Sequence, residues 1–245
     1  MKAEIIVPDN LKEINLKQYQ KFVKLQADNE GTFFLQQKMI EIFCGIKGED
    51  VLKFKYDDVD RVTTILNDMF DSKPELVKTF KLKGIEYGFI PNLSAISFGE
   101  YIDLDTYMGD WSNIEIAMNV LYRPIKQKQG DKYLIEDYTT EGKEILLDMP
   151  MDAVLSSVFF FLSFRTGLCN EYSQLFESGT GDTTSSRSGF GKKWGWYQSL
   201  YALAGSDITR FENITKLNLH ECLLMLTFMK EKSELEASEM KKKFK

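Results

Sequence analysis

The sequence predicts a mainly α fold of the α+β class, with a minor β-hairpin. Apolar residues recur at helical spacing through most of the chain, whereas residues 77–90 alternate with period two around a glycine. The hydrophobic content of 43% against 28% charged residues is that of a folded protein. We expect a mainly helical domain at 1–177, a flexible linker or loop at 178–191, and a small C-terminal helical region with a charged tail at 192–245.

Three helices are expected in the first 71 residues. Asn15 and Gln18 have the spacing of a capping box, which predicts a helix that begins there and runs to about Asp28. Further helices are expected at 32–46 and 58–71, each with apolar side chains on one face. Turns rich in Gly and Asp separate the three, so we expect a compact helical unit.

The β structure is expected to be small. Apolar side chains alternate with polar ones on both sides of Gly84, which predicts a hairpin within residues 77–90. A second candidate pair of strands is 132–136 with 144–147.

Two S-x-x-E segments follow the hairpin. Both Ser97–Glu100 and Ser112–Glu115 have the spacing of a capping box, and they predict helices at 98–109 and 113–122. Pro124 should end the second helix, because the residue before a proline avoids helical geometry.

Residues 151–176 predict the longest apolar helix, which should be central to the fold. A membrane span needs about 20 consecutive apolar residues. Three serines and then Arg165 interrupt this run, so we expect a buried helix and no membrane partner.

Residues 178–191 read SGTGDTTSSRSGFG, a composition that buries too little apolar surface to offset the entropy of ordering. After them we expect helices at 194–204, near 208–211, and from Leu219 onward. The last helix begins with an apolar stripe, and beyond Lys230 it should be a solvated extension.

Charge and cysteine content narrow the partners and the compartment. A net charge of −6 argues against a nucleic-acid partner, and the lysines at 241–243 and 245 are interpreted as a soluble helix end. Three widely spaced cysteines suit a reducing compartment, and no signal peptide is evident. The expected location is therefore a reducing compartment.

The sequence offers little that suggests catalysis. The segment SRSGFGKK resembles a phosphate-binding loop, but Ser186 replaces its first glycine and Lys193 replaces its Ser or Thr. His220 is the only histidine, so the usual Ser- or Cys-based triads are excluded unless His220 serves alone. Four clustered acids could hold Mg²⁺ or act as acid and base, although a solvated acidic face is favoured: Glu100, Asp103, Asp105 and Asp110. We expect no enzyme, cofactor or metal.

The C-terminal region is instead predicted to bind a partner. A unit of about fifty residues buries little core alone, so it must dock, self-associate or leave apolar surface for a client. Its aromatic residues could stack nucleic-acid bases, but packing against protein is favoured because few basic residues flank them. The predicted partner-binding residues are Trp194, Trp196, Tyr197, Tyr201, Leu219, Leu223 and Leu226.

Three stretches of the chain support a family resemblance. They are LKEINLKQYQKF, then EYGFIPNLSAISFGEYIDLDTY with LYRPI, and GWYQSLYALAGSDITRFENITKLNLHECLLMLTFMKEK. With them the chain resembles the tail assembly chaperones of tailed bacteriophages. The resemblance implies a non-enzymatic protein that binds the tail tape measure protein and keeps its apolar helices soluble. It also implies that the protein is located in the host cytoplasm, with the virion as the alternative. The hairpin at 77–90 does not map onto that family.

Two other functions stay open from the sequence. The first is a structural virion protein of the connector, tail, baseplate or capsid interior, which would bind other phage structural proteins. The second is a small enzyme that uses the acidic cluster. Self-association into a homo-oligomer is also open.

Overall fold

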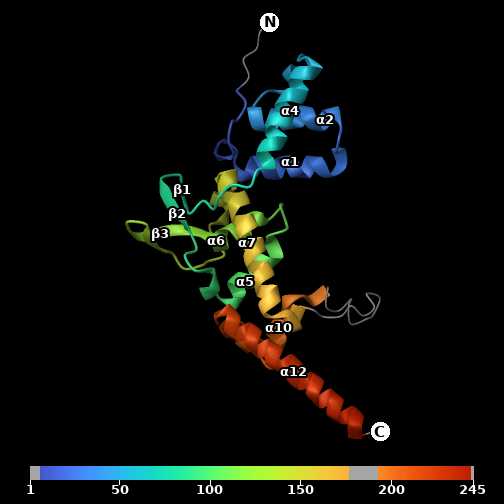
Figure 1. The fold of residues 1–245 in the computed structure, drawn as a ribbon. Coiled ribbons are helices and arrows are strands. Elements are labelled where there is room, and N and C mark those ends of the chain that lie inside the picture. Colours follow the sequence, from blue (N-terminus) through green and yellow to red (C-terminus); the bar gives the residue numbers. More distant parts are fainter. Residues whose placement is uncertain (1–5, 177–192, 244–245) are drawn as a thin grey trace. The chain divides into compact units, whose positions relative to one another are not determined.

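The computed structural model describes residues 6–176 and 193–243, and the linker predicted at 178–191 lies outside them. The structure is 64% helical with one small antiparallel sheet of four strands, which confirms the mainly α, α+β class (Figure 1). The chain forms two compact units. Unit 1 comprises Met1–Pro91 and Thr106–Phe161, and unit 2 comprises Asn92–Asp105 and Leu162–Lys245.

This division differs from the domains expected along the sequence, because a central segment joins the C-terminal region. The amide of Phe98 donates to the carbonyl of Leu217 at 2.8 Å, and the amide of Leu219 donates to the carbonyl of Ile96 at 3.0 Å. These two bonds make a short antiparallel bridge between Ser97 and Asn218. Backbone pairing of this kind between distant segments leaves no local sequence signal.

Helices dominate the first part of unit 1. They are η1 (Leu11–Glu13), α1 (Leu16–Asn29), α2 (Phe33–Cys44), α3 (Gly48–Val51) and α4 (Tyr56–Phe70). The capping box that opens α1 is confirmed, since Asn15 and Gln18 each accept the other's backbone amide through a side-chain oxygen. In Figure 1, α1, α2 and α4 lie side by side, and their apolar faces bury a shared core.

The sheet of unit 1 has the order β1-β2-β3-β4, with bounds Thr79–Leu82, Ile85–Phe89, Tyr122–Gln129 and Lys132–Ile135. The predicted hairpin is confirmed: β1 pairs with β2 across a turn in which Lys83 and Gly84 have φ of 50° and 85°. Positive φ at two turn residues suits the twist of a tight hairpin, and glycine adopts it without strain.

Of the second predicted strand pair, the strand at 132–136 is present as β4, but its partner is wrong. Strand β4 pairs with β3 through a turn at Gly130, which has φ 60°, and residues Lys143–Asp148 form the 3-10 helix η3. The outer half of β3 carries polar side chains on both faces, so it lacks the alternation that would have indicated a strand.

The two S-x-x-E segments behave differently. At the start of α5 (Phe98–Tyr107), Ser97 and Glu100 form the predicted capping box. The box predicted at Ser112–Glu115 is wrong, because α6 (Ile114–Leu121) begins after Asn113 and the Glu115 carboxylate accepts instead from the Gln20 side chain at 2.8 Å. A tertiary partner thus replaces the local one.

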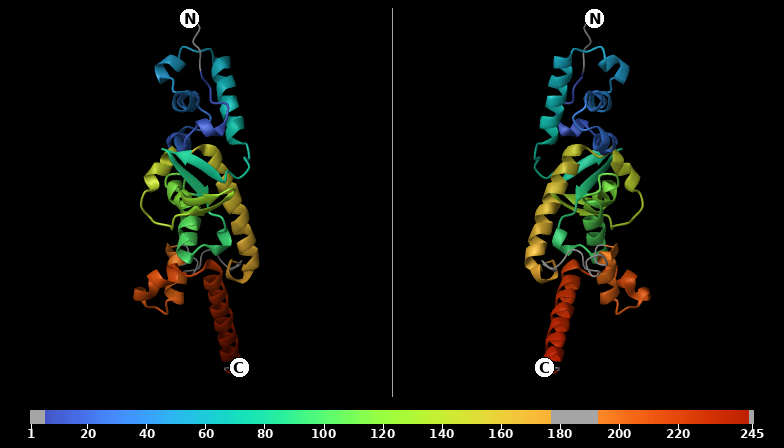
Figure 2. Two further views of the ribbon diagram at one scale, coloured as in Figure 1. Left: turned by 90° about the vertical axis from the view of Figure 1, so that its left-hand side faces the viewer. Right: turned by 90° about the vertical axis from the view of Figure 1, so that its right-hand side faces the viewer.

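Helix α7 (Met151–Glu171) begins in unit 1. All its residues from 151 to 157 are buried, and Figure 2 shows this part beside the sheet. Across that contact the buried Tyr122 hydroxyl lies 3.3 Å from the carbonyl of Ala153 on α7, and it also donates to the carbonyl of Val77, just before β1, at 2.7 Å. Beyond its first two turns the helix is buried on one face only. Phe161 and Leu168 are 1% and 3% exposed, whereas Phe159 and Phe160 are 38% and 40% exposed.

By length and composition α7 also passes as a membrane span, with a mean hydropathy of 1.3. Half of that stretch is buried inside the protein, as in the core helix of a folded domain, so the feature is weak evidence for a membrane.

The regular elements of unit 2 are all helices within its described residues. Besides η2 (Leu93–Ala95), most of α5 and the second half of α7, it contains α8 (Ser173–Phe176), α10 (Trp196–Leu203), η4 (Ile208–Arg210), α11 (Phe211–Thr215) and α12 (Leu219–Lys243). The helix predicted from Leu219 is therefore present, and it stays helical through Lys243.

Candidate functional site

The predicted partner-binding residues occupy three different environments in unit 2. Leu219 and Leu223 are fully buried, which corrects the expectation that they offer surface to a client: they belong to the core of the unit. Trp196 and Leu226 are half-buried. The remaining three are exposed, at 40%, 46% and 49% respectively: Trp194, Tyr197 and Tyr201.

A groove of about 620 Å³ brings some of these residues together. Its walls come from α8, α10 and α12. It is lined by Leu175, Phe176, Gly195, Trp196, Gln198, Ser199, Ala202, Leu223, Leu226, Met229 and Lys230. Of the seven predicted residues it therefore includes Trp196, Leu223 and Leu226.

The exposed aromatics lie away from this groove. Along α10, positions 196, 199 and 202 follow helical spacing and line the groove, whereas Tyr197 and Tyr201 fall on the other side of the helix. The ring of Tyr197 packs edge-on against Phe211, with centroids 5.4 Å apart. The predicted residues therefore do not form one continuous surface.

Trp196 forms one wall of the groove because its neighbours fix its ring. The indole meets Phe98 and Tyr101 edge to face, at centroid distances of 5.6 and 5.4 Å. Its ring N–H donates to Oδ2 of Asp105 at 2.9 Å. Apolar contact on the ring and one polar contact at its edge are how a buried tryptophan is usually satisfied.

The other oxygen of Asp105 holds an arginine. Nε of Arg165 donates to Oδ1 of Asp105 at 2.5 Å, and the Asp105 side chain is only 18% exposed. This carboxylate raises the pKa of the Arg165 guanidinium above its ordinary value. Asp105 thus joins α5, α7 and α10 at the back of the groove, a structural role that the sequence did not reveal.

Two other acids of the predicted cluster have separate structural roles. Glu100 caps α5, and Asp110 accepts from the amide of Ser112 and from the side chain of Asn113. Within residues 6–176 and 193–243, no group of three or more His, Cys, Asp or Glu side chains is placed to hold a metal ion. The acids are therefore not gathered around one point there.

His220 and Cys222 lie on α12 near the groove. Nδ1 of His220 is 2.9 Å from the Tyr172 hydroxyl and 3.8 Å from the Glu171 carboxylate, so it connects α12 to the chain that follows α7. Burial, with a smaller contribution from Glu221, raises the pKa of the Cys222 thiol to about 11. A thiol that stays protonated at neutral pH is a weak nucleophile.

The rim of the groove is polar at one place. Nζ of Lys230 donates to the carbonyl of Gln174, where α12 meets α8. This ammonium group is the positive charge that an entering ligand would meet beside the apolar lining.

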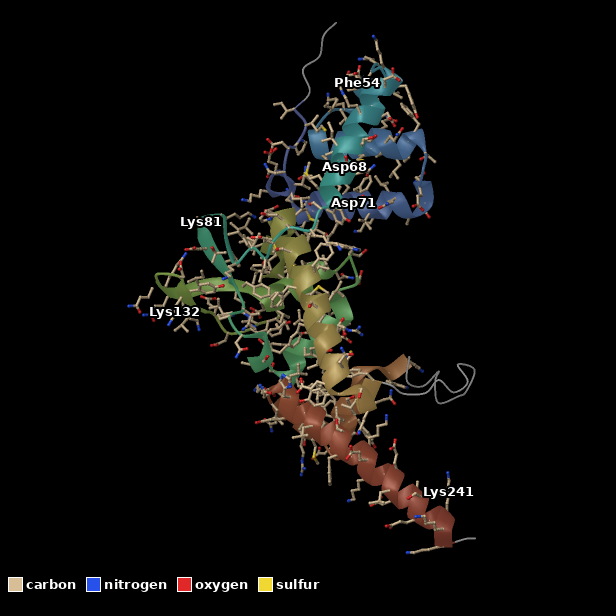
Figure 3. All side chains as sticks on the ribbon, in the orientation of Figure 1. Phe54, Asp68, Asp71, Lys81, Lys132 and Lys241 are labelled. Atoms are coloured by element: carbon tan, nitrogen blue, oxygen red, sulfur yellow. The ribbon has the colours of Figure 1, made fainter. Side chains whose placement is uncertain are left out.

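A second cavity, of about 540 Å³, lies in unit 1. Its lining mixes apolar side chains with three carboxylates, and Figure 3 labels one of these, Asp68 on α4. The lining consists of Asp9, Asn10, Leu11, Lys12, Ile65, Asp68, Met69, Ser72, Pro74 and Asp152. It has no aromatic residue, so the groove in unit 2 is the better candidate for an apolar partner.

Comparison of the chain with protein-family models, with curated proteins and with solved structures finds no match.

Proposed function

We propose that this protein is a non-enzymatic phage assembly protein that binds the tail tape measure protein in the host cytoplasm and keeps it soluble until the tail is built. The observation that carries the proposal is the apolar groove between α8, α10 and α12. Tape measure helices, as the resemblance implies, are long and apolar. An amphipathic helix can lay its apolar face into such a groove with anchors at helical spacing.

The chemistry of the lining fits a client of variable sequence. Met229 and Leu226 present flexible aliphatic side chains, and the fixed ring of Trp196 presents a rigid one. Methionine adapts to irregular partners, and a rigid ring gives contact area with little loss of entropy. Lys230 at the rim favours a client helix that carries an acidic residue beside its apolar face.

A charge placed inside the groove tests the proposal. Ala202 is a small, half-buried residue of the lining, so Ala202→Arg puts a guanidinium where the client's apolar side chains would lie. The variant should lose the ability to solubilise tape measure fragments in coexpression. Ala237→Arg is the matched control, because Ala237 is exposed on α12 outside the groove.

Thermal melts of both variants separate loss of binding from loss of folding. If Ala202→Arg stays folded and still solubilises the fragments, the groove is not the client site. The alternative function, a structural virion protein, predicts stoichiometric amounts of this chain in mature particles. Mass spectrometry of purified virions would then detect it, and a pure chaperone would be ruled out.

A further inference from the structure

Helix α12 has a second apolar face that the groove does not use. Leu224, Phe228 and Leu235 are 65%, 56% and 60% exposed. Their spacing of four and seven residues places them on one side of a helix. We call these three residues the outer stripe.

The outer stripe lies opposite the face that α12 packs into unit 2. Leu219, Cys222 and Leu223 are buried, and Leu226 lines the groove, so this set marks the inner face. At 100° per residue, Leu226 is displaced by about 200° from Leu224. Within the described residues of unit 2, the outer stripe is therefore exposed to solvent, while the inner face is buried or lines the groove.

The second half of α12 has little support from its own unit. All residues from 231 to 243 are exposed, and Figure 3 shows the helix continuing to Lys241 beyond the other helices of unit 2. Isolated helices of about 12–15 residues are marginal in water, and most helical stability comes from a packed apolar face. Leu235 supplies an apolar side chain for such a face, and no described residue of unit 2 covers it.

Charges along the same side of the helix favour one kind of occupant. Glu221, Glu231 and Lys242 share the side of the outer stripe at helical spacing. In a parallel pair of α12 helices, each of these residues would lie level with the same residue of the second copy, so like charges would face each other. In an antiparallel pair centred between Glu231 and Lys232, Phe228 lies level with Leu235 of the second copy, and Lys242 lies level with Glu221.

We propose that the outer stripe of α12 is the interface of a homodimer, in which two copies of this chain pair their α12 helices antiparallel. The overlap from Glu221 to Lys242 is about 32 Å of helix. It packs Phe228 of each copy against Leu235 of the other, places Leu224 inside the overlap and level with Glu239 of the other copy, and pairs opposite charges at its two ends and its centre. The inner face of each α12 still packs against its own unit 2 and lines its groove, so the dimer interface does not depend on what the groove binds.

The oligomeric state of the full chain tests the interface. Sedimentation analysis over a wide range of concentration should show a dimer. Leu235→Glu removes two buried leucines from each dimer and should weaken dimerisation by roughly a hundredfold. Because Leu235 is outside the core of unit 2, the monomer of this variant should melt at the same temperature as the wild-type monomer.

The matched control is Ala237→Glu, which adds the same charge two residues away on the other side of α12 and should leave the dimer intact. A wild-type chain that stays monomeric at high concentration would overturn the proposal. It would also be overturned if Leu235→Glu and Ala237→Glu were equally dimeric. If only client binding is lost in Leu235→Glu, the stripe belongs to the client and not to a second copy.

Charge reversal tests the antiparallel direction. Glu221→Lys and Lys242→Glu should each weaken the dimer several-fold, since each puts like charges level with one another. The two changes together restore opposite charges and should recover most of the wild-type affinity. A double variant that is weaker than both single variants would contradict the antiparallel register.

Discussion

The contact between Asp105 and Trp196 gives the sharpest test of how the groove is held. Asp105→Ala removes the acceptor of the indole N–H and the partner of Arg165. Trp196→Phe removes the donor and keeps an aromatic ring in the same wall. The two changes together complete a double-mutant cycle, which isolates the interaction from the packing of the ring.

The structure sets the expected magnitudes. A hydrogen bond to a charged group contributes about 1.5–3 kcal/mol, and a buried donor left unsatisfied costs about 1–3 kcal/mol. Arg165 is 47% exposed, so its ion pair should add only about 0–1 kcal/mol. We expect Asp105→Ala to lower the free energy of unfolding by about 2–3 kcal/mol, with a coupling energy to Trp196 of about 1–2 kcal/mol.

Urea unfolding followed by far-UV circular dichroism measures all four proteins with one probe. Asp105→Asn serves as the control, because an amide oxygen can still accept from the indole while the charge is lost. It should cost about 1 kcal/mol or less. A coupling energy near zero would mean that Asp105 does not hold Trp196, and the groove wall would then depend on ring packing alone.

Two further predictions concern unit 1. Gly88→Ala should lower the free energy of unfolding by about 1–3 kcal/mol, because a Cβ there would lie 2.5 Å from Cε2 of Tyr133. The Tyr133 ring cannot move away freely, since its hydroxyl donates to the carbonyl of Phe89. In a Tyr133→Ala background, denaturant melts should show the loss nearly absent, and a full loss there would exclude the clash as its cause. Phe161→Ala should cost about 3–5 kcal/mol, since that ring is 1% exposed, while Phe159→Ala at 38% exposure should cost clearly less; equal losses in the same melts would contradict the burial argument.

Local signals in the sequence were sufficient where the partners are close along the chain. Asn15 with Gln18 and Ser97 with Glu100 form their capping boxes as predicted, and Gly84 turns the hairpin. In each case both partners lie within a few residues, so the backbone geometry between them is nearly fixed and the spacing alone indicates the contact.

Spacing along one helix also determined that α12 carries apolar side chains on an inner face, but it did not determine which of them are accessible. The periodicity that predicted a partner surface at Leu219 and Leu223 is the same whether the face meets a client or the core. Only the packing of α8, α10 and η2 against α12 decided that both are buried.

The remaining features depend on segments that are far apart in the sequence. Strand β4 pairs with β3 and not with residues 144–147, Glu115 accepts from Gln20 instead of capping α6, and Asp105 binds Trp196 ninety-one residues away. A carboxylate has the same local appearance whether it caps a helix, faces water or accepts from an indole, because its environment is made by distant parts of the chain. The sequence by itself therefore determined the helices, the first hairpin and the apolar faces of this protein. The tertiary structure decided which of those faces became core, which became the groove, and which stayed exposed on α12.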